Sequence, residues 1–142
     1  MPRIGILNLV IGFAVIFLAA SAGALIATDM TEAFISAPQR LSNWQMTLQK
    51  TAHGHSNLFG MLHITLGLTL AYSRLNHRVK ALQTLGLFLG TIAMGPLMYI
   101  RSGMGPTDSV DFVTVLTGIF LSAALASIAV HTGGLAARLI RP

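Results

Sequence analysis

The sequence has no cysteine, few charged residues and very few acidic residues. Without cysteine, the chain has no disulfide framework, no thiolate metal site and no cysteine nucleophile. Charged residues make up 9% of the 142 residues, whereas soluble domains carry roughly 25%, so this composition does not supply a water-exposed surface. The net charge is +5, but the nine Lys and Arg stand singly between apolar runs rather than on one face. This scatter argues against nucleic-acid binding.

Long apolar runs take the place of charge. Hydrophobic residues make up 54% of the chain, and the mean hydropathy is +0.72. A helix needs roughly 20 apolar residues to cross a bilayer, and four stretches meet this requirement: residues 4–28, 53–72, 81–100 and 112–131. The first is longer than the apolar core of a signal peptide and is interpreted as a span. The sequence therefore predicts an all-α bundle of four transmembrane helices, forming a single integral membrane domain over residues 1–142.

The distribution of basic residues predicts the orientation of these spans. Three basic residues would lie on one side of the membrane: Arg40, Lys50 and Arg101. Six would lie on the other: Arg3, Arg74, Arg78, Lys80, Arg138 and Arg141. The positive-inside rule assigns the richer side to the cytoplasm, so both termini are predicted to be cytoplasmic in a bacterial inner membrane. Trp44 and Tyr99 then fall near the outer interface and Tyr72 near the inner one, as expected for aromatic belts.

The connections between the spans carry their own signals. Ser42 followed by Gln45 fits a capping box, which predicts that the second helix begins near Asn43, before its apolar part. Pro96 removes a backbone hydrogen bond and predicts a kink in the third helix. The segment 102–108 contains two glycines and a proline and is predicted to be a turn.

Polar residues in a membrane span are costly, and the second span holds most of them. Residues 51–63 include three histidines and an asparagine: His53, His55, His63 and Asn57. At 100° per residue, His53, Asn57 and Gly60 fall within about 40° of one another. His55 points nearly opposite to His53, so the two cannot ligate one ion from the same helix.

This pattern allows several interpretations. The histidines can be neutral and hydrogen-bonded between helices, with Gly60 only allowing close packing. Alternatively, one histidine ligates a haem iron, and Gly60 lets the flat macrocycle approach the helix. Copper is a further possibility, using histidines together with methionines: Met61, Met94, Met98 and Met104. His77 and His131 stand near the inner ends of helices and are predicted to be interfacial.

The second span resembles the haem-binding helix of the styrene oxide isomerase family. The resemblance rests on Ala52-His53 followed by Gly60-Met61, on the second of four short spans. It continues through the basic inner turn and three further places: Leu85-Gly86, Tyr99, and Asp111-Phe112. Two positions depart from the family. Phe59 stands where the family has an asparagine before the glycine, so that Asn57 is the nearest amide, and Ile92 and Ala93 replace an acid of the third helix.

The resemblance implies a homotrimeric membrane enzyme that carries haem b near the interface between protomers. Its ferric iron would polarise the oxygen of a small apolar epoxide, which is isomerised to an aldehyde without net redox change. His53 matches the axial iron ligand, and Gly60 and Met61 match the cofactor-binding segment. Tyr99 matches a pocket tyrosine when one residue is gapped after Gly86, and Asn57 is the second candidate catalytic group.

Two other functional classes stay open on the sequence. In the first, His55 of a neighbouring protomer, or His63, supplies a second axial ligand, and the protein is an electron carrier or a subunit of a redox complex. In the second, the histidines serve packing alone and the chain is a structural membrane subunit without a cofactor.

Overall fold

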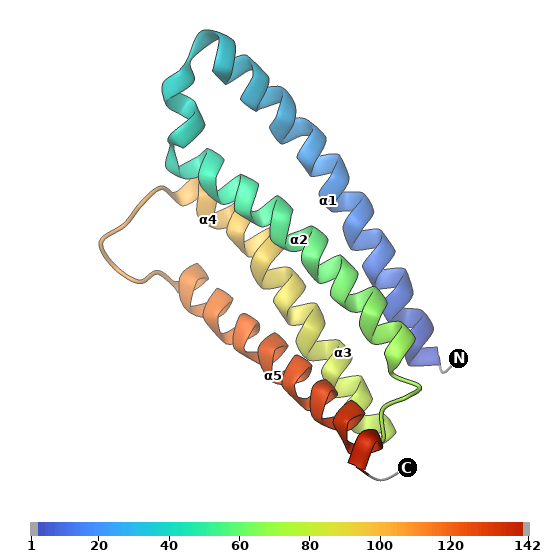
Figure 1. Cartoon of the computed structure of the whole chain (residues 1–142). Helices are drawn as coiled ribbons and strands as arrows, with labels where there is room; N and C mark the ends of the chain where they lie inside the picture. The colour runs from blue at the N-terminus through green and yellow to red at the C-terminus, as the bar shows by residue number, and fades with distance from the viewer. Residues whose placement is uncertain (1–2, 141–142) are drawn as a thin grey trace.

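The computed structural model describes residues 3–140, apart from the side chain of Ser42, and this range contains helices and no strand. Its elements are α1 (Arg3–Ser36), a 3₁₀ turn (Pro38–Ser42), α2 (Trp44–Thr69), α3 (His77–Ile92), a π-helix (Ala93–Leu97), α4 (Met98–Met104) and α5 (Phe112–Ile140). Because α3, the π-helix and α4 follow one another without interruption, the chain forms four long helical segments (Figure 1). The all-α prediction is therefore confirmed for the described residues.

Three of the four helical segments are long and apolar enough to cross a membrane. They are Arg3–Ser36, His77–Met104 and Phe112–Ile140. The fourth, α2, has 26 residues and a length of about 39 Å. It is long enough, but its histidines, asparagine and lysine lower its hydropathy. The predicted second span therefore differs in kind from the other three.

The helices extend beyond the apolar stretches that predicted them. α1 continues to Ser36 rather than ending near residue 28, and α5 continues to Ile140 rather than 131. The predicted turn at 102–108 is wrong in its first residues, because α4 includes Ser102 and Gly103 and the connection starts at Gly105, whose φ is +74°. Hydropathy marks only the apolar part of a helix, whereas the backbone hydrogen bonds continue into the polar part.

The start of α2 agrees with its prediction, although the cap is a different residue. Asn43 is the N-cap, and its side-chain oxygen accepts a hydrogen bond of 2.8 Å from the backbone N–H of Met46. The helix then begins at Trp44. The predicted cap, Ser42, has its side chain outside the described part. An asparagine at this position satisfies an N–H group that the first helical turn leaves free.

Pro96 lies where its helix is disturbed, and the kink itself stays a prediction. The disturbance is a π-helix over Ala93–Leu97, which contains Pro96. Proline lacks the N–H of the usual ladder, and one extra residue in the turn accommodates this loss. The helix resumes as α4, so Tyr99 stands two residues beyond the widened segment.

The four segments lie side by side, with α2 between α1 and the α3–α4 segment (Figure 1). α5 packs along α3, and within residues 3–140 the backbones of α2 and α5 do not approach each other closely. The described N- and C-terminal residues lie at the same end of the bundle (Figure 1). Arg141, one of the basic residues used for orientation, lies outside the described residues.

The contact between α1 and α2 depends on glycine. A Cβ atom on Gly60 would lie 2.6 Å from Cγ1 of Ile16 and 3.0 Å from the carbonyl oxygen of Gly12. One on Gly12 would lie 2.7 Å from the carbonyl oxygen of Gly60. Only glycine permits so close an approach of two helix backbones.

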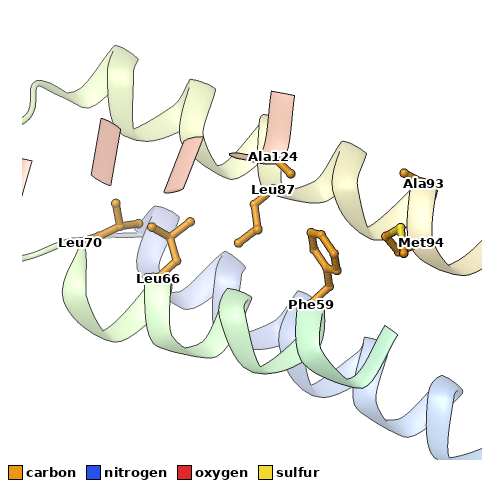
Figure 2. Packing of buried hydrophobic residues seen from close by; sticks show 7 residues of the cluster. All are labelled: Phe59, Leu66, Leu70, Leu87, Ala93, Met94 and Ala124. Carbon is orange, nitrogen blue, oxygen red and sulfur yellow. The ribbon is translucent and has the colours of Figure 1, made fainter. Parts of the chain in front are cut away.

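The buried core connects α2 with α3 and α5. It is formed by seven apolar residues (Figure 2): Phe59, Leu66, Leu70, Leu87, Ala93, Met94 and Ala124. By contrast, α1 and α5 expose large apolar side chains on their outer faces, such as Phe17 and Ile119. Such faces are suited to lipid rather than to water.

Candidate functional site

His53 lies in the first half of α2 and faces α1, where its ring is half-buried. The ring rests on Gly23, because a Cβ atom there would lie only 2.7 Å from Nδ1 and 2.9 Å from Nε2. Nδ1 lies 2.8 Å from the carbonyl oxygen of Ala19. A carbonyl oxygen only accepts, so Nδ1 of the neutral ring carries the proton and donates it. Nε2 is left with a free lone pair, the form in which imidazole binds a metal.

Asn57 stands one helical turn after His53, beside this lone pair. Its amide nitrogen donates to the carbonyl oxygen of His53 at 3.1 Å and lies 3.4 Å from Nε2. The second distance is long for a hydrogen bond. Asn57 therefore approaches Nε2 from the same face of α2 without fully occupying the lone pair.

Gly60 and Met61 take different positions one turn further along. Gly60 is buried against α1, so its free side is filled by Ile16 and the backbone of Gly12 rather than by open space. Met61 is 61% exposed. Asn57 is half-buried and Met61, four residues later on the same face of α2, is exposed. The accessible surface next to His53 therefore runs along these two residues, and we call it the Asn57–Met61 face.

Tyr99 lines a separate groove of about 440 Å³ between α1 and the segment formed by α3, the π-helix and α4. The groove is bounded by Ala19, whose carbonyl oxygen accepts a hydrogen bond from Nδ1 of His53, and by Ser56 on α2. The hydroxyl oxygen of Tyr99 is buried and has no hydrogen-bond partner among the described residues. The groove is mostly apolar, which suits a small apolar ligand.

Phe59, Ile92 and Ala93, the residues that depart from the resemblance, lie in different environments. Phe59 packs in the core against Gly90 of α3, and it therefore faces away from the Asn57–Met61 face. Ile92 lines the Tyr99 groove, and Ala93 is fully buried. Phe59 thus belongs to the interior, whereas Ile92 adds an apolar side chain to the lining of the groove.

His55 and His63 occupy two contrasting environments. His55 lines a shallow hollow of about 390 Å³ beside Lys50, and its Nδ1 donates to the carbonyl oxygen of Thr51 at 3.0 Å. His63 is completely buried, and its Nδ1 donates to Oδ1 of Asn8 at 2.8 Å. Asn8 in turn donates to Oγ1 of Thr84 at 2.8 Å, which joins α2, α1 and α3. His63 therefore connects helices, while His55 presents Nε2 outside the bundle.

His77 and His131, both predicted to be interfacial, also differ. His77 is exposed at the first residue of α3. His131 does not end its helix, because α5 continues to Ile140, and its Nε2 lies 2.8 Å from Oγ1 of Thr69. His131 thus belongs to the contact between α2 and α5.

Residues 3–140 contain no group of three or more His, Asp or Glu side chains placed to hold a metal ion. Met94 is in the core, whereas Met61 and Met104 are exposed, so the methionines share no common environment. A haem requires less of the protein, because the porphyrin supplies four nitrogen ligands and one imidazole completes the attachment. Nε2 of His53 is one donor that fits that requirement.

An ion pair joins the helix ends beyond Tyr99. Nε of Arg101 lies 2.9 Å from Oδ2 of Asp111, and its guanidinium lies 4.8 Å from the centre of the Trp44 ring. The pKa of Asp111 is lowered, first because the backbone N–H of Thr114 donates to its carboxylate, and further by the charge of Arg101. These contacts hold the start of α2, the end of α4 and the start of α5 together.

Sequence reasoning missed the part of the site that belongs to α1. Ala19 and Gly23 orient and accommodate the His53 ring, although neither has reactive chemistry of its own. The available signal was their spacing, since small residues four apart lie on one face of a helix.

Comparison with known proteins adds no relative. No family model, no curated protein and no solved structure matches the chain. Functional inference therefore depends on the geometry around His53 and on the motif resemblance.

Proposed function

We propose that the chain crosses a bacterial inner membrane four times, with both termini in the cytoplasm. Three helices have the length and hydropathy for this, and α2 lies between α1 and the α3–α4 segment. Several polar side chains of α2 have partners within residues 3–140: His53 bonds to Ala19, His63 to Asn8, and Thr65 to the carbonyl oxygen of Met61. Such internal hydrogen bonds lower the cost of these side chains in the bilayer interior.

Reporter fusions test this topology. A reporter fused after Pro142 should be cytoplasmic, whereas one inserted at Pro38, between α1 and α2, should be external. An external C-terminus would contradict four crossings, because an even number of crossings returns the chain to its starting side.

We further propose that the protein binds haem b through Nε2 of His53. The observation that carries this proposal is the 2.8 Å contact between Nδ1 of His53 and the carbonyl oxygen of Ala19. A hydrogen bond from the far nitrogen is the usual support of a metal-ligating histidine, since it fixes the tautomer and the ring orientation. The macrocycle would lie along the Asn57–Met61 face, because the Gly60 side is filled by α1.

The open Asn57–Met61 face favours the trimer that the family resemblance implies. Met61 is 61% exposed and Leu58 beside it is 50% exposed, so one protomer leaves a bound group uncovered on this side. A second copy of the chain packed there would exclude lipid and water from the site. This arrangement would place the cofactor near the interface between protomers.

The proposed reaction is the isomerisation of a small apolar epoxide to an aldehyde. Ferric haem supplies a Lewis acid for the epoxide oxygen when it is bound. Asn57 is assigned to orientation of the substrate oxygen because its amide nitrogen, 3.4 Å from Nε2 of His53, makes it the amide nearest to the proposed ligand, and an amide N–H can donate to an oxygen on which negative charge develops. Tyr99 lines the adjoining groove, which is mostly apolar, and its buried hydroxyl has no hydrogen-bond partner within residues 3–140. We assign both residues to substrate orientation.

A second function, electron transfer by a haem with two histidine ligands, has one observation in its favour. Nδ1 of His55 donates to the carbonyl oxygen of Thr51, which leaves Nε2 of an outward-facing ring free to meet a neighbouring protomer. His63 is a poorer second ligand, because its ring is completely buried between three helices. A low-spin ferric spectrum of the purified protein would favour this function over the isomerase.

Turnover of an epoxide distinguishes the two functions. Ferric protein should convert styrene oxide to phenylacetaldehyde without an electron donor, and reduction should stop turnover because ferrous iron is the weaker Lewis acid. Asn57→Leu and Tyr99→Phe should keep haem but lower kcat about tenfold or more, as loss of a donor to a developing oxyanion does. His77→Leu serves as the control with unchanged rate. Five-coordinate ferric protein that converts no epoxide would contradict the isomerase proposal.

A further inference from the structure

Ser56 of α2 lines the groove of about 440 Å³ that also includes Tyr99. Most of the other lining residues are apolar, and they come from α1 and the α3–α4 segment. The volume lies in the range of about 300–1,000 Å³ that is usual for small-molecule sites. Leu18 is 65% exposed and Phe88 is 41% exposed at the edge of the groove, so a lipid-soluble molecule can enter it from the bilayer of the proposed topology.

The hydroxyl of Ser56 is uncommitted, unlike the other serine and threonine hydroxyls of the helices. In α1 to α5, every other serine and threonine donates its hydrogen to an oxygen, in most cases to the backbone carbonyl four residues earlier. Ser56 has no hydrogen-bond partner within residues 3–140. Its oxygen is also not one of the buried unpaired atoms of this range, so part of its surface is accessible.

Gly95 of the π-helix locates this hydroxyl in the groove. A Cβ atom on Gly95 would lie 2.8 Å from Oγ of Ser56, and Gly95 itself lines the groove. Oγ therefore lies at the wall where the π-helix faces α2, and a glycine leaves space beside it. A π-helical turn inside a longer helix is frequently found at a functional site.

Ser56 supplies the accessible hydrogen among the polar side chains of this lining. Thr91 also lines the groove, but its hydroxyl donates to the carbonyl oxygen of Leu87 at 3.2 Å. The hydroxyl oxygen of Tyr99 is buried. A ligand with an acceptor oxygen can take the hydrogen of Ser56. A ligand without a donor of its own brings no further polar group that the apolar lining would leave unpaired.

We propose that the groove binds a small, mostly apolar molecule through a hydrogen bond from Ser56 to a ketone, aldehyde, ether or epoxide oxygen. Ser56 is then a binding residue that selects ligands by their oxygen. The inference deepens the proposed function and rests on it for the role of this ligand as substrate, but the binding itself requires neither haem nor turnover.

Fluorine NMR of the purified full-length protein in detergent tests the site with two probes of similar size, 4-fluoroacetophenone and 1-ethyl-4-fluorobenzene. After correction for partition into empty micelles, the ketone should bind about fivefold more tightly, the usual value of one net hydrogen bond. Ser56→Ala should remove this preference and leave the affinity of the ethyl compound unchanged. Equal affinity of the two probes for the unmodified protein would overturn the proposal, as would a preference retained in full by Ser56→Ala.

Two further variants locate the probes. Thr91→Val removes a hydroxyl from the same lining with little change in volume, and it should keep the preference because that hydroxyl is bonded to its own helix. Ala22→Leu narrows the groove, so both probes should bind several-fold more weakly. A preference that is lost with Thr91→Val, or affinities that Ala22→Leu leaves unchanged, would contradict the assignment.

Cyanide separates this site from the proposed haem. A ketone oxygen can also reach an open position on ferric iron, so the titrations are repeated with cyanide, which occupies that position. The preference for the ketone should remain, and a preference abolished by cyanide would assign the ketone to the iron and overturn the proposal. Protein that contains no haem but keeps the preference would contradict the proposed function while supporting the role of Ser56.

Discussion

The two halves of α2 use histidine in opposite ways. In the first half, His53 is half-buried, donates through Nδ1 to a backbone carbonyl oxygen, and keeps Nε2 free beside an accessible face. In the second half, His63 is completely buried and joins α2 to two other helices through Asn8 and Thr84. The same residue type on one helix is thus suited to ligation in one place and to assembly in the other. The difference comes from the neighbouring helices rather than from the local sequence.

The largest effect on stability is expected in the buried half. Asn8→Leu removes the hydrogen bonds to His63 and Thr84 and leaves both ring nitrogens of His63 unpartnered, which should lower the free energy of unfolding by about 2–3 kcal/mol. Denaturation in mixed micelles measures this change. The double variant Asn8→Leu/His63→Leu should recover part of the loss, because it leaves no unpaired imidazole in the core.

Asn57→Leu is the matched control in the other half. Asn57 is half-buried and bonds mainly to its own helix, so its loss should cost less than about 1 kcal/mol of stability. Equal destabilisation by Asn8→Leu and Asn57→Leu would remove the distinction between the two halves of α2.

A smaller effect on stability is expected at Gly60. If Gly60 serves helix packing, its substitution lowers stability, whereas if it serves the cofactor, its substitution lowers haem content. Gly60→Ala forces a Cβ atom against Ile16 and the backbone of Gly12, which should destabilise the protein by about 1–3 kcal/mol through overpacking. Gly54→Ala on the same helix meets nothing within 4 Å and should be neutral or slightly stabilising. Thermal unfolding and haem content are measured on both variants. Haem loss without a loss of stability in Gly60→Ala would show that Gly60 serves the cofactor rather than the helix contact.

Much of the architecture was predictable from composition. Apolar runs predicted four helices because a bilayer demands helices of a given length, and the described residues contain four helical segments. The ends of α1 and α5 were placed too early, since hydropathy falls where lipid ends while the helix continues to Ser36 and Ile140. That α2 is less apolar than the other three segments was visible in the sequence only as an excess of polar residues.

Less of the candidate site was predictable. The spacing of His53, Asn57 and Gly60 correctly placed them near one face of α2, but it did not reveal that Gly60 is covered by α1. Contacts between helices distant in sequence, such as His53 with Ala19, depend on packing that periodicity does not encode. For the same reason, no pattern in the sequence indicates that His131 bonds to Thr69.

Haem content of His53 variants tests the proposed ligand most directly. His53→Gly should lose most of the Soret absorbance per folded protein. His63→Leu and His77→Leu should keep the same Soret absorbance per folded protein as the unmodified chain. Imidazole added to His53→Gly should restore haem binding, because it can occupy the space of the missing ring and donate to the carbonyl oxygen of Ala19. Full haem retention in His53→Gly without added imidazole would contradict the assignment and transfer the ligand role to another histidine.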